Sequence, residues 1–107
     1  MTDPGILKQR LVLEAPVETA DDAGGVLRSY APAAFLWAAV DPIDARADTR
    51  GGDAGATIRS RITVRAGPEI TTRHRLRQGS RLWRIVSVRE ADRSGRLLAI
   101  EAEERFG

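Results

Sequence analysis

The side chains that carry out most protein chemistry are scarce in this sequence of 107 residues. Cysteine is absent, which excludes disulfides, thiolate metal sites and cysteine nucleophiles. The single histidine, His74, lies in the polar, basic run Thr71–Arg75, and no strand-to-helix nucleophile turn accompanies it. We therefore interpret His74 as a surface residue and predict no catalytic residues.

Aspartates before and within a glycine-rich stretch offer the oxygen ligands that hard metal ions prefer: Asp41, Asp44, Asp48 and Asp53. Their spacing does not match a calcium-binding loop, and Arg46 and Arg50 are interleaved with them, where they would repel a cation. The glycines nearby lack the lysine and serine or threonine of a phosphate-binding loop. The sequence thus predicts no metal site and no cofactor.

Three glutamates near the C-terminus, Glu101, Glu103 and Glu104, could suggest the paired carboxylates of a glycoside hydrolase. On a strand, Glu101 and Glu103 share one face while Glu104 lies on the other. We expect a solvated strand edge here, and we predict that the chain is not an enzyme.

The elements that position these residues are strands. In Ile58–Arg65 one face carries Ile58, Ser60, Ile62 and Val64, and the other carries Arg59, Arg61, Thr63 and Arg65. Alternation with a period of two is typical of a half-buried strand. Further strands are predicted at Gln9–Val17, Val26–Tyr30, Phe35–Val40, Arg75–Arg77, Arg81–Arg89 and Arg96–Glu103.

Turn residues separate these strands at 21–25, 78–80 and 91–95, and Pro42 is expected to end the strand before it. Nothing resembles a secretory signal or an apolar run long enough to cross a membrane. The sequence predicts an all-β fold, a small antiparallel barrel or sandwich, in a single domain over residues 1–107.

Both tryptophans, Trp37 and Trp83, lie within apolar strands and are expected to fill the core. Arg81 and Arg84 flank Trp83, which keeps open a second role as a platform on which bases stack.

Charge is unevenly distributed along the chain. Residues 1–57 hold 5 basic and 9 acidic side chains, whereas residues 58–107 hold 12 arginines and 6 acidic side chains. Six of these arginines are candidates for contact with DNA or with a protein partner: Arg59, Arg61, Arg65, Arg73, Arg75 and Arg77. One reading is a free-standing nucleic-acid-binding barrel of the OB type. The other is solvated strand faces in a chain whose arginine, alanine and glycine reflect GC-rich coding.

Residues 44–57 contain no large apolar side chain and several glycines. A connection of this length is usually functional or disordered. It is either a surface hairpin without a partner, or a loop that becomes ordered when a partner or a ring of subunits surrounds it.

Four loose motifs occur in a fixed order along nearly the whole chain. They are the D-x-x-G-G turn at Asp21–Gly25, W-A-x-V-x-P at Trp37–Pro42, I-T-V-R at Ile62–Arg65 and W-R-I-V-S-V at Trp83–Val88. In this order they resemble the head–tail joining proteins of tailed phages, the small stopper or adaptor family. The sequence departs from that family at Gly79–Ser80, where an aromatic residue is often found.

The resemblance implies a β-barrel that assembles into a ring, commonly a hexamer, at the neck of a virion or virus-like particle put together in the bacterial cytoplasm. Portal or adaptor proteins would contact one face of the ring, tail proteins the other, and packaged double-stranded DNA would fill its channel. In the family the long loop projects into that channel, which here implies a gate formed by Arg46, Asp48, Thr49, Arg50, Gly51, Gly52 and Asp53. GC-rich coding would suit a gene transfer agent. A tail terminator or another tail component remains an alternative.

Overall fold

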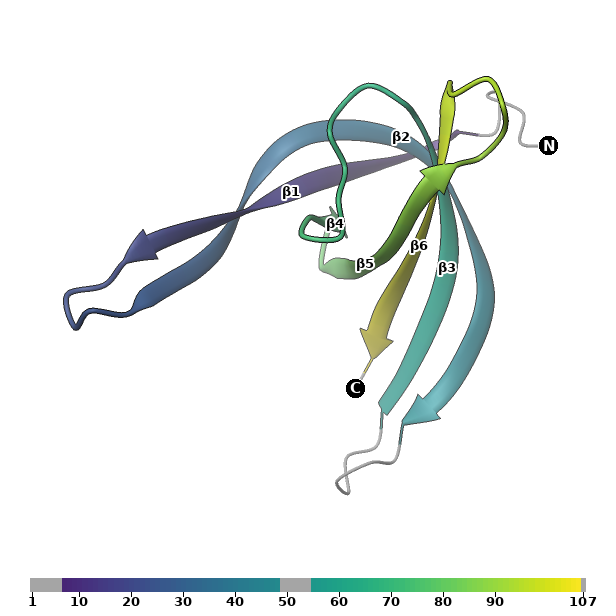
Figure 1. The fold of residues 1–107 in the computed structure, drawn as a ribbon. Coiled ribbons are helices and arrows are strands. Elements are labelled where there is room, and N and C mark those ends of the chain that lie inside the picture. The colour runs from purple at the N-terminus through teal and green to yellow at the C-terminus, as the bar shows by residue number, and fades with distance from the viewer. Residues whose placement is uncertain (1–6, 49–54, 107) are drawn as a thin grey trace.

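The computed structural model describes residues 7–48 and 55–106 of the chain. Its strands are β1 (Gln9–Ala20), β2 (Val26–Asp48), β3 (Gly55–Arg65), β4 (Arg75–Gln78), β5 (Arg81–Glu90) and β6 (Leu97–Phe106). All neighbours pair antiparallel, and the sheet closes on itself in the order β1-β2-β3-β6-β5-β4 (Figure 1). The predicted all-β fold is confirmed. No helix in the described residues is long and apolar enough to cross a membrane.

Strand β2 is longer than the sequence predicted. The expected strands Val26–Tyr30 and Phe35–Val40 are parts of one continuous strand that runs on to Asp48. The prediction that Pro42 ends a strand was wrong, because β2 continues through Pro42 to Asp48. The register of β2 against β3 shifts between Pro42 and Asp44, which marks a β-bulge. At such a bulge a missing backbone N–H costs no ladder hydrogen bond.

The expected loop at 44–57 is shorter for the same reason. Residues 44–48 belong to β2, and residues 55–57 belong to β3. The sequence did not predict this pairing, because residues 44–48 and 55–57 are small or polar and show no alternation of large apolar and polar side chains. Residues 49–54 lie outside the described part of the chain.

The first hairpin extends well beyond the barrel. β4 pairs with β1 only at Val12–Glu14, and β3 pairs with β2 only from Ala38 onward. Residues 15–20 and 26–31 therefore pair with each other alone, and we call this two-stranded extension the arm (Figure 1). Val26 and Leu27 on the arm are 63% and 59% exposed. A two-stranded ribbon of this kind is marginally stable without further contacts.

The turn at the tip of the arm depends on Asp21. Its Oδ1 accepts hydrogen bonds from the N–H groups of Ala23 and Gly25 at 2.9 and 2.7 Å. Gly24 has a φ of 83°, which glycine adopts without steric cost. The turn predicted at 21–25 is confirmed.

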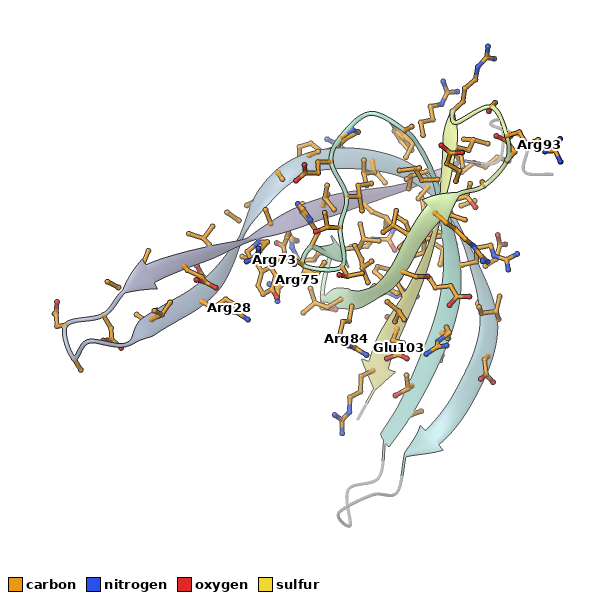
Figure 2. The ribbon with its side chains drawn as sticks, viewed as in Figure 1. Arg28, Arg73, Arg75, Arg84, Arg93 and Glu103 are labelled. Atoms are coloured by element: carbon orange, nitrogen blue, oxygen red, sulfur yellow. The ribbon has the colours of Figure 1, made fainter. Side chains whose placement is uncertain are left out.

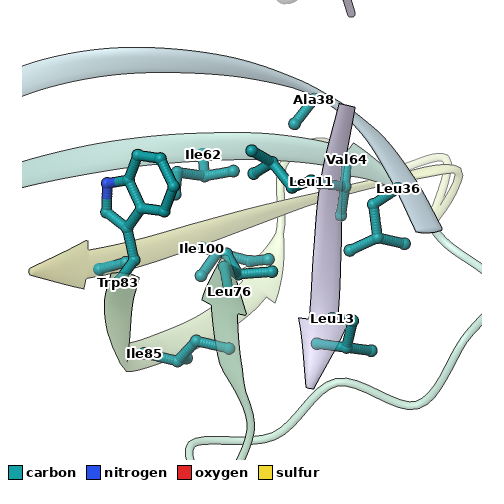
Figure 3. Packing of buried hydrophobic residues seen from close by; sticks show 11 residues of the cluster. Leu11, Leu13, Leu36, Ala38, Ile62, Val64, Leu76, Trp83, Ile85 and Ile100 are labelled. Carbon is teal, nitrogen blue, oxygen red and sulfur yellow. The ribbon is translucent and has the colours of Figure 1, made fainter. Parts of the chain in front are cut away.

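The core fills the barrel with side chains from every strand (Figure 3). Its buried members are Leu11, Leu13, Leu36, Ala38, Ile62, Val64, Leu76, Trp83, Ile85, Ile100 and Ala102. Trp83 is fully buried, as expected, but the prediction for Trp37 was wrong, because it is 58% exposed. Leu36 and Ala38 on either side of Trp37 take the inward positions. Its segment is apolar on both faces, so the alternation does not reveal which face is buried.

An ion pair lies beside Trp83 on the inner side of the sheet. Glu104 follows the inward-facing Ile100 and Ala102 at intervals of two and is buried. Arg81 donates to its carboxylate through Nε and Nη2, at 2.7 and 2.8 Å, and its guanidinium lies 4.5 Å from the centre of the Trp83 ring. The prediction of a solvated edge was therefore wrong, since β6 lies between β3 and β5.

Candidate assembly site

A row of charged residues crosses all six strands on the outer face of the barrel. Cross-strand register aligns one residue from each strand, in the order Asp44, Arg59, Glu103, Arg84, Arg75 and Glu14. We call this row the charged belt. Directly opposed residues of a sheet lie close enough for their side chains to interact. Ion pairs join Arg59, Glu103 and Arg84 in one part of the belt, and Arg75 and Glu14 in another.

Glu103 is held between two arginines of the belt. Arg59, on β3, donates a hydrogen bond of 2.6 Å to the Oε1 of Glu103. Arg84, on β5, donates one of 3.0 Å to its Oε2. These hydrogen bonds, the one from Arg59 above all, lower the pKa of the Glu103 carboxyl. The pairs therefore join β3, β6 and β5 on their outer side.

Glu14 is held in the same way at the other end of the belt. Arg75 and Arg77 donate their Nε atoms to its two oxygens at 2.6 and 2.9 Å. Burial acts to raise the pKa of Glu14, but the hydrogen bonds from Arg77 and Arg75 outweigh it and leave that pKa lowered. Arg75 also lies over the ring of Tyr30, 3.9 Å from its centre. This cluster fastens the short strand β4 to β1 and to the arm.

The six arginines that the sequence suggested for contact with DNA or a partner do not form one patch. Arg59, Arg75 and Arg77 are engaged in the ion pairs just described. Arg61 and Arg65 are exposed on β3, and Arg73 precedes β4. In the closed sheet β3 and β4 are three strands apart. The arginine excess of the C-terminal half thus serves internal pairing in part, which sequence distance alone does not reveal.

An exposed aromatic pair is the surface feature that sequence reasoning missed. Phe35 and Trp37 are 63% and 58% exposed, and the guanidinium of Arg10 lies 4.2 Å from the centre of the Phe35 ring. Large apolar side chains gathered on a monomer surface typically mark a contact with another protein. The signal was present in the sequence as two aromatics at a spacing of two, which places them on one face of a strand.

The single histidine has a local role in its turn. The Nδ1 of His74 accepts a hydrogen bond from the Thr71 N–H at 3.2 Å and lies 2.9 Å from the Thr71 hydroxyl oxygen. Within residues 7–48 and 55–106 no group of three or more histidine, aspartate or glutamate side chains is placed to hold a metal ion.

The residues suggested for a gate are described only in part. Arg46 and Asp48 belong to the end of β2, opposite Thr57 and Gly55 of β3. Thr49, Arg50, Gly51, Gly52 and Asp53 lie outside the described residues. β6 pairs with β3 as far as Ala56, which lies next to the Asp48–Gly55 pair at the end of the described hairpin.

Comparison with known proteins gives matches over almost the whole chain. The sequence model of a family described as "Phage head completion protein" matches residues 2–105. A chain of the solved structure titled "Virion of native gene transfer agent (GTA) particle" is similar, with 32% sequence identity and a TM-score of 0.81. The match covers 92% of this chain and 94% of that chain.

A second solved structure shares the fold. It is protein SF1141 from Shigella flexneri 2a, with 22% identity, a TM-score of 0.69 and coverage of 96% of both chains. No curated protein sequence matches this chain.

Proposed function

The chain belongs to the phage head completion protein family, and from that membership we propose that it is a stopper-type ring protein at the head–tail junction of a phage or gene transfer agent particle. The membership itself supports a structural, head–tail connector type of role in a virion, in company with other particle proteins. It points to a component that assembles and not to a catalyst.

The observation that carries the ring is the exposed aromatic pair together with the arm, whose two strands pair with no third strand. A contact with another subunit would bury Phe35 and Trp37, which are among the most valuable anchors of protein interfaces. The arm would gain the further contacts that an isolated ribbon lacks. A ring of identical subunits, which we propose to be a hexamer, supplies both at every position.

The gate is proposed for the tip of the β2–β3 hairpin, with Arg46, Asp48, Thr49, Arg50, Gly51, Gly52 and Asp53 directed at the channel. Alternating arginine and aspartate would form ion pairs between subunits, each worth about 0–1 kcal/mol at an exposed site. Together, such pairs would keep the channel closed behind packaged double-stranded DNA. Because each pair is weak, the pairs could break one after another when the gate opens. Portal or adaptor proteins on one face of the ring, and tail proteins on the other, complete the junction.

The gate is tested in particles that carry a shortened hairpin. Residues 49–54 are replaced by Asn-Gly, which connects paired strands with a two-residue turn. In a second variant, residues 49–54 are replaced by six glycine and serine residues, which keeps the length of the hairpin and removes its charge. We expect both variants to assemble, the shortened one to lose packaged DNA, and the glycine–serine one to retain less DNA than the natural chain. Full DNA retention by the shortened variant would overturn the gate.

A further inference from the structure

A hollow lies where the arm meets the barrel. Its volume is about 610 Å³, and its walls come from the arm, the segment before β4 and the outer faces of β5 and β6. Arg28 on the arm, Arg73 before β4, Arg75 on β4 and Arg84 on β5 surround it (Figure 2). Pro16, Tyr30 and Leu82 add apolar surface. The hollow is thus both basic and partly apolar.

The charged belt passes through this hollow at the point where two of its arginines meet. Arg75 and Arg84 are directly opposite each other on β4 and β5. Each is paired with a carboxylate on its far side, Glu14 and Glu103 respectively. Like charges directly opposed on a sheet are unfavourable. A carboxylate placed between Arg75 and Arg84 would restore the alternation of charge that the rest of the belt follows.

The hollow also has hydrogen-bond donors to spare. A guanidinium carries five N–H groups, whereas Arg84 uses Nη2 for Glu103 and Arg75 uses Nε for Glu14. Arg28 is similarly held by Glu18 at 2.8 Å. Arg75 is held by the buried Glu14 and by the Tyr30 ring, so it loses little conformational freedom when a ligand arrives. At least this donor is arranged in advance for an acidic group.

We propose that this hollow binds an extended, carboxylate-bearing segment of a protein partner, with one carboxylate between Arg75 and Arg84. Apolar side chains of the same segment would contact Tyr30 and Leu82, both of which line the hollow. A DNA duplex fits this site poorly, because its phosphates are carried on a stiff convex surface and Glu103 lies on the wall. The segment would belong to a neighbour in the particle, which gives the proposed connector a defined docking chemistry.

The test uses the isolated chain and three probes. A capped peptide of alternating glutamate and leucine is titrated at low salt while backbone amide shifts are followed by NMR. The same peptide with glutamine, and a short mixed-sequence DNA duplex, are titrated separately. We expect the glutamate peptide alone to shift residues of the hollow saturably, with a Kd on the order of 1 mM or tighter.

Matched variants locate the site. The double variant Arg73→Gln, Arg84→Gln should weaken binding of the glutamate peptide roughly tenfold, the loss expected from one charge-assisted hydrogen bond. The double variant Arg89→Gln, Arg93→Gln removes the same charge from the far end of β5 and the turn after it, and should leave the Kd unchanged; Arg93 lies well away from the hollow (Figure 2).

Four results would overturn the proposal. They are no saturable shift with the glutamate peptide, equal binding of the glutamine peptide, stronger binding of DNA at the hollow, or shifts there that depend only on protein concentration and so assign the site to a second copy. Because no ring is needed for the measurement, its failure leaves the proposed connector function standing.

Discussion

The guanidinium of Arg75 lies 3.9 Å from the centre of the Tyr30 ring, and its Nε donates to Glu14 at 2.6 Å. The first contact reaches the arm and the second reaches the barrel end of β1. One side chain on a four-residue strand thus connects the projecting arm to the closed sheet. Since the arm pairs with no third strand, this contact is one that ties it to the barrel beyond the continuation of β1 and β2.

Replacing Arg75 with lysine should loosen the arm without unfolding the barrel. Lysine keeps the charge but loses the planar group that stacks on Tyr30 and bonds Glu14 at the same time. We expect amide hydrogen exchange in residues 15–20 and 26–31 to quicken several-fold while β3 and β6 stay protected. Arg61→Lys, on the exposed face of β3, is the control. Unchanged exchange in the arm would show that Arg75 does not position it.

Stability should fall in acid because of Glu14 and Glu103. Both carboxyls have a pKa below their ordinary value of 4.5 in the folded chain. The folded state then binds fewer protons than the unfolded state, so the stability they contribute is complete above about pH 4.5 and is lost as pH falls through their folded pKa values. Urea unfolding followed from pH 7 down to pH 3 measures this loss.

The variant Glu103→Gln should show a shallower acid loss than the natural chain, since one of the two responsible groups no longer titrates. Glu69→Gln removes an equal charge from an exposed segment and serves as its control. An identical pH dependence in Glu103→Gln and the natural chain would mean that the belt does not govern acid stability.

The ion pair beside Trp83 joins the buried Glu104 to Arg81, whose side chain is 46% exposed. Glu104→Ala removes the two charge-assisted hydrogen bonds to Arg81, and should lower the free energy of unfolding by about 1–2 kcal/mol. The double change Arg81→Met, Glu104→Leu replaces both charges with apolar groups and should cost less than the single change. Chemical denaturation of the natural chain, Glu104→Ala and the double variant measures these differences in unfolding free energy. A double variant less stable than Glu104→Ala would show that the loss does not come from an unpaired Arg81.

Much of this architecture is readable from sequence because apolar and polar residues alternate. The strand at Ile58–Arg65 and the turn at Asp21–Gly25 were predicted from alternation and turn chemistry, and the closed sheet contains both. The resemblance to head–tail joining proteins was likewise confirmed by the family match.

Other features depend on pairings that the sequence does not encode locally. Trp37 was misplaced because its neighbours are apolar on both sides, and the end of β2 was missed because a bulge at Pro42 lets the strand continue. The belt joins residues up to 61 positions apart, such as Glu14 and Arg75. Only the register of the closed sheet brings them together.

The exposed aromatic pair should matter for assembly and hardly for folding. Phe35→Ser with Trp37→Ser removes side chains that are more than half exposed, so the unfolding free energy should change by less than about 1 kcal/mol. Incorporation into particles, measured by quantitative mass spectrometry of purified virions, should fall at least several-fold. Normal incorporation would assign the aromatic pair no role in the ring. Val26→Ser on the arm provides a comparison at a second exposed apolar site.

The central claim is that copies of this chain form a ring between head and tail. A cryo-EM map of the intact particle at its neck tests it most directly. We predict a closed ring of this barrel on the channel axis, with Trp37 buried at a subunit contact and the β2–β3 hairpin tips directed at the channel. A neck in which this chain is absent, or is present without a ring around the DNA path, would contradict the account.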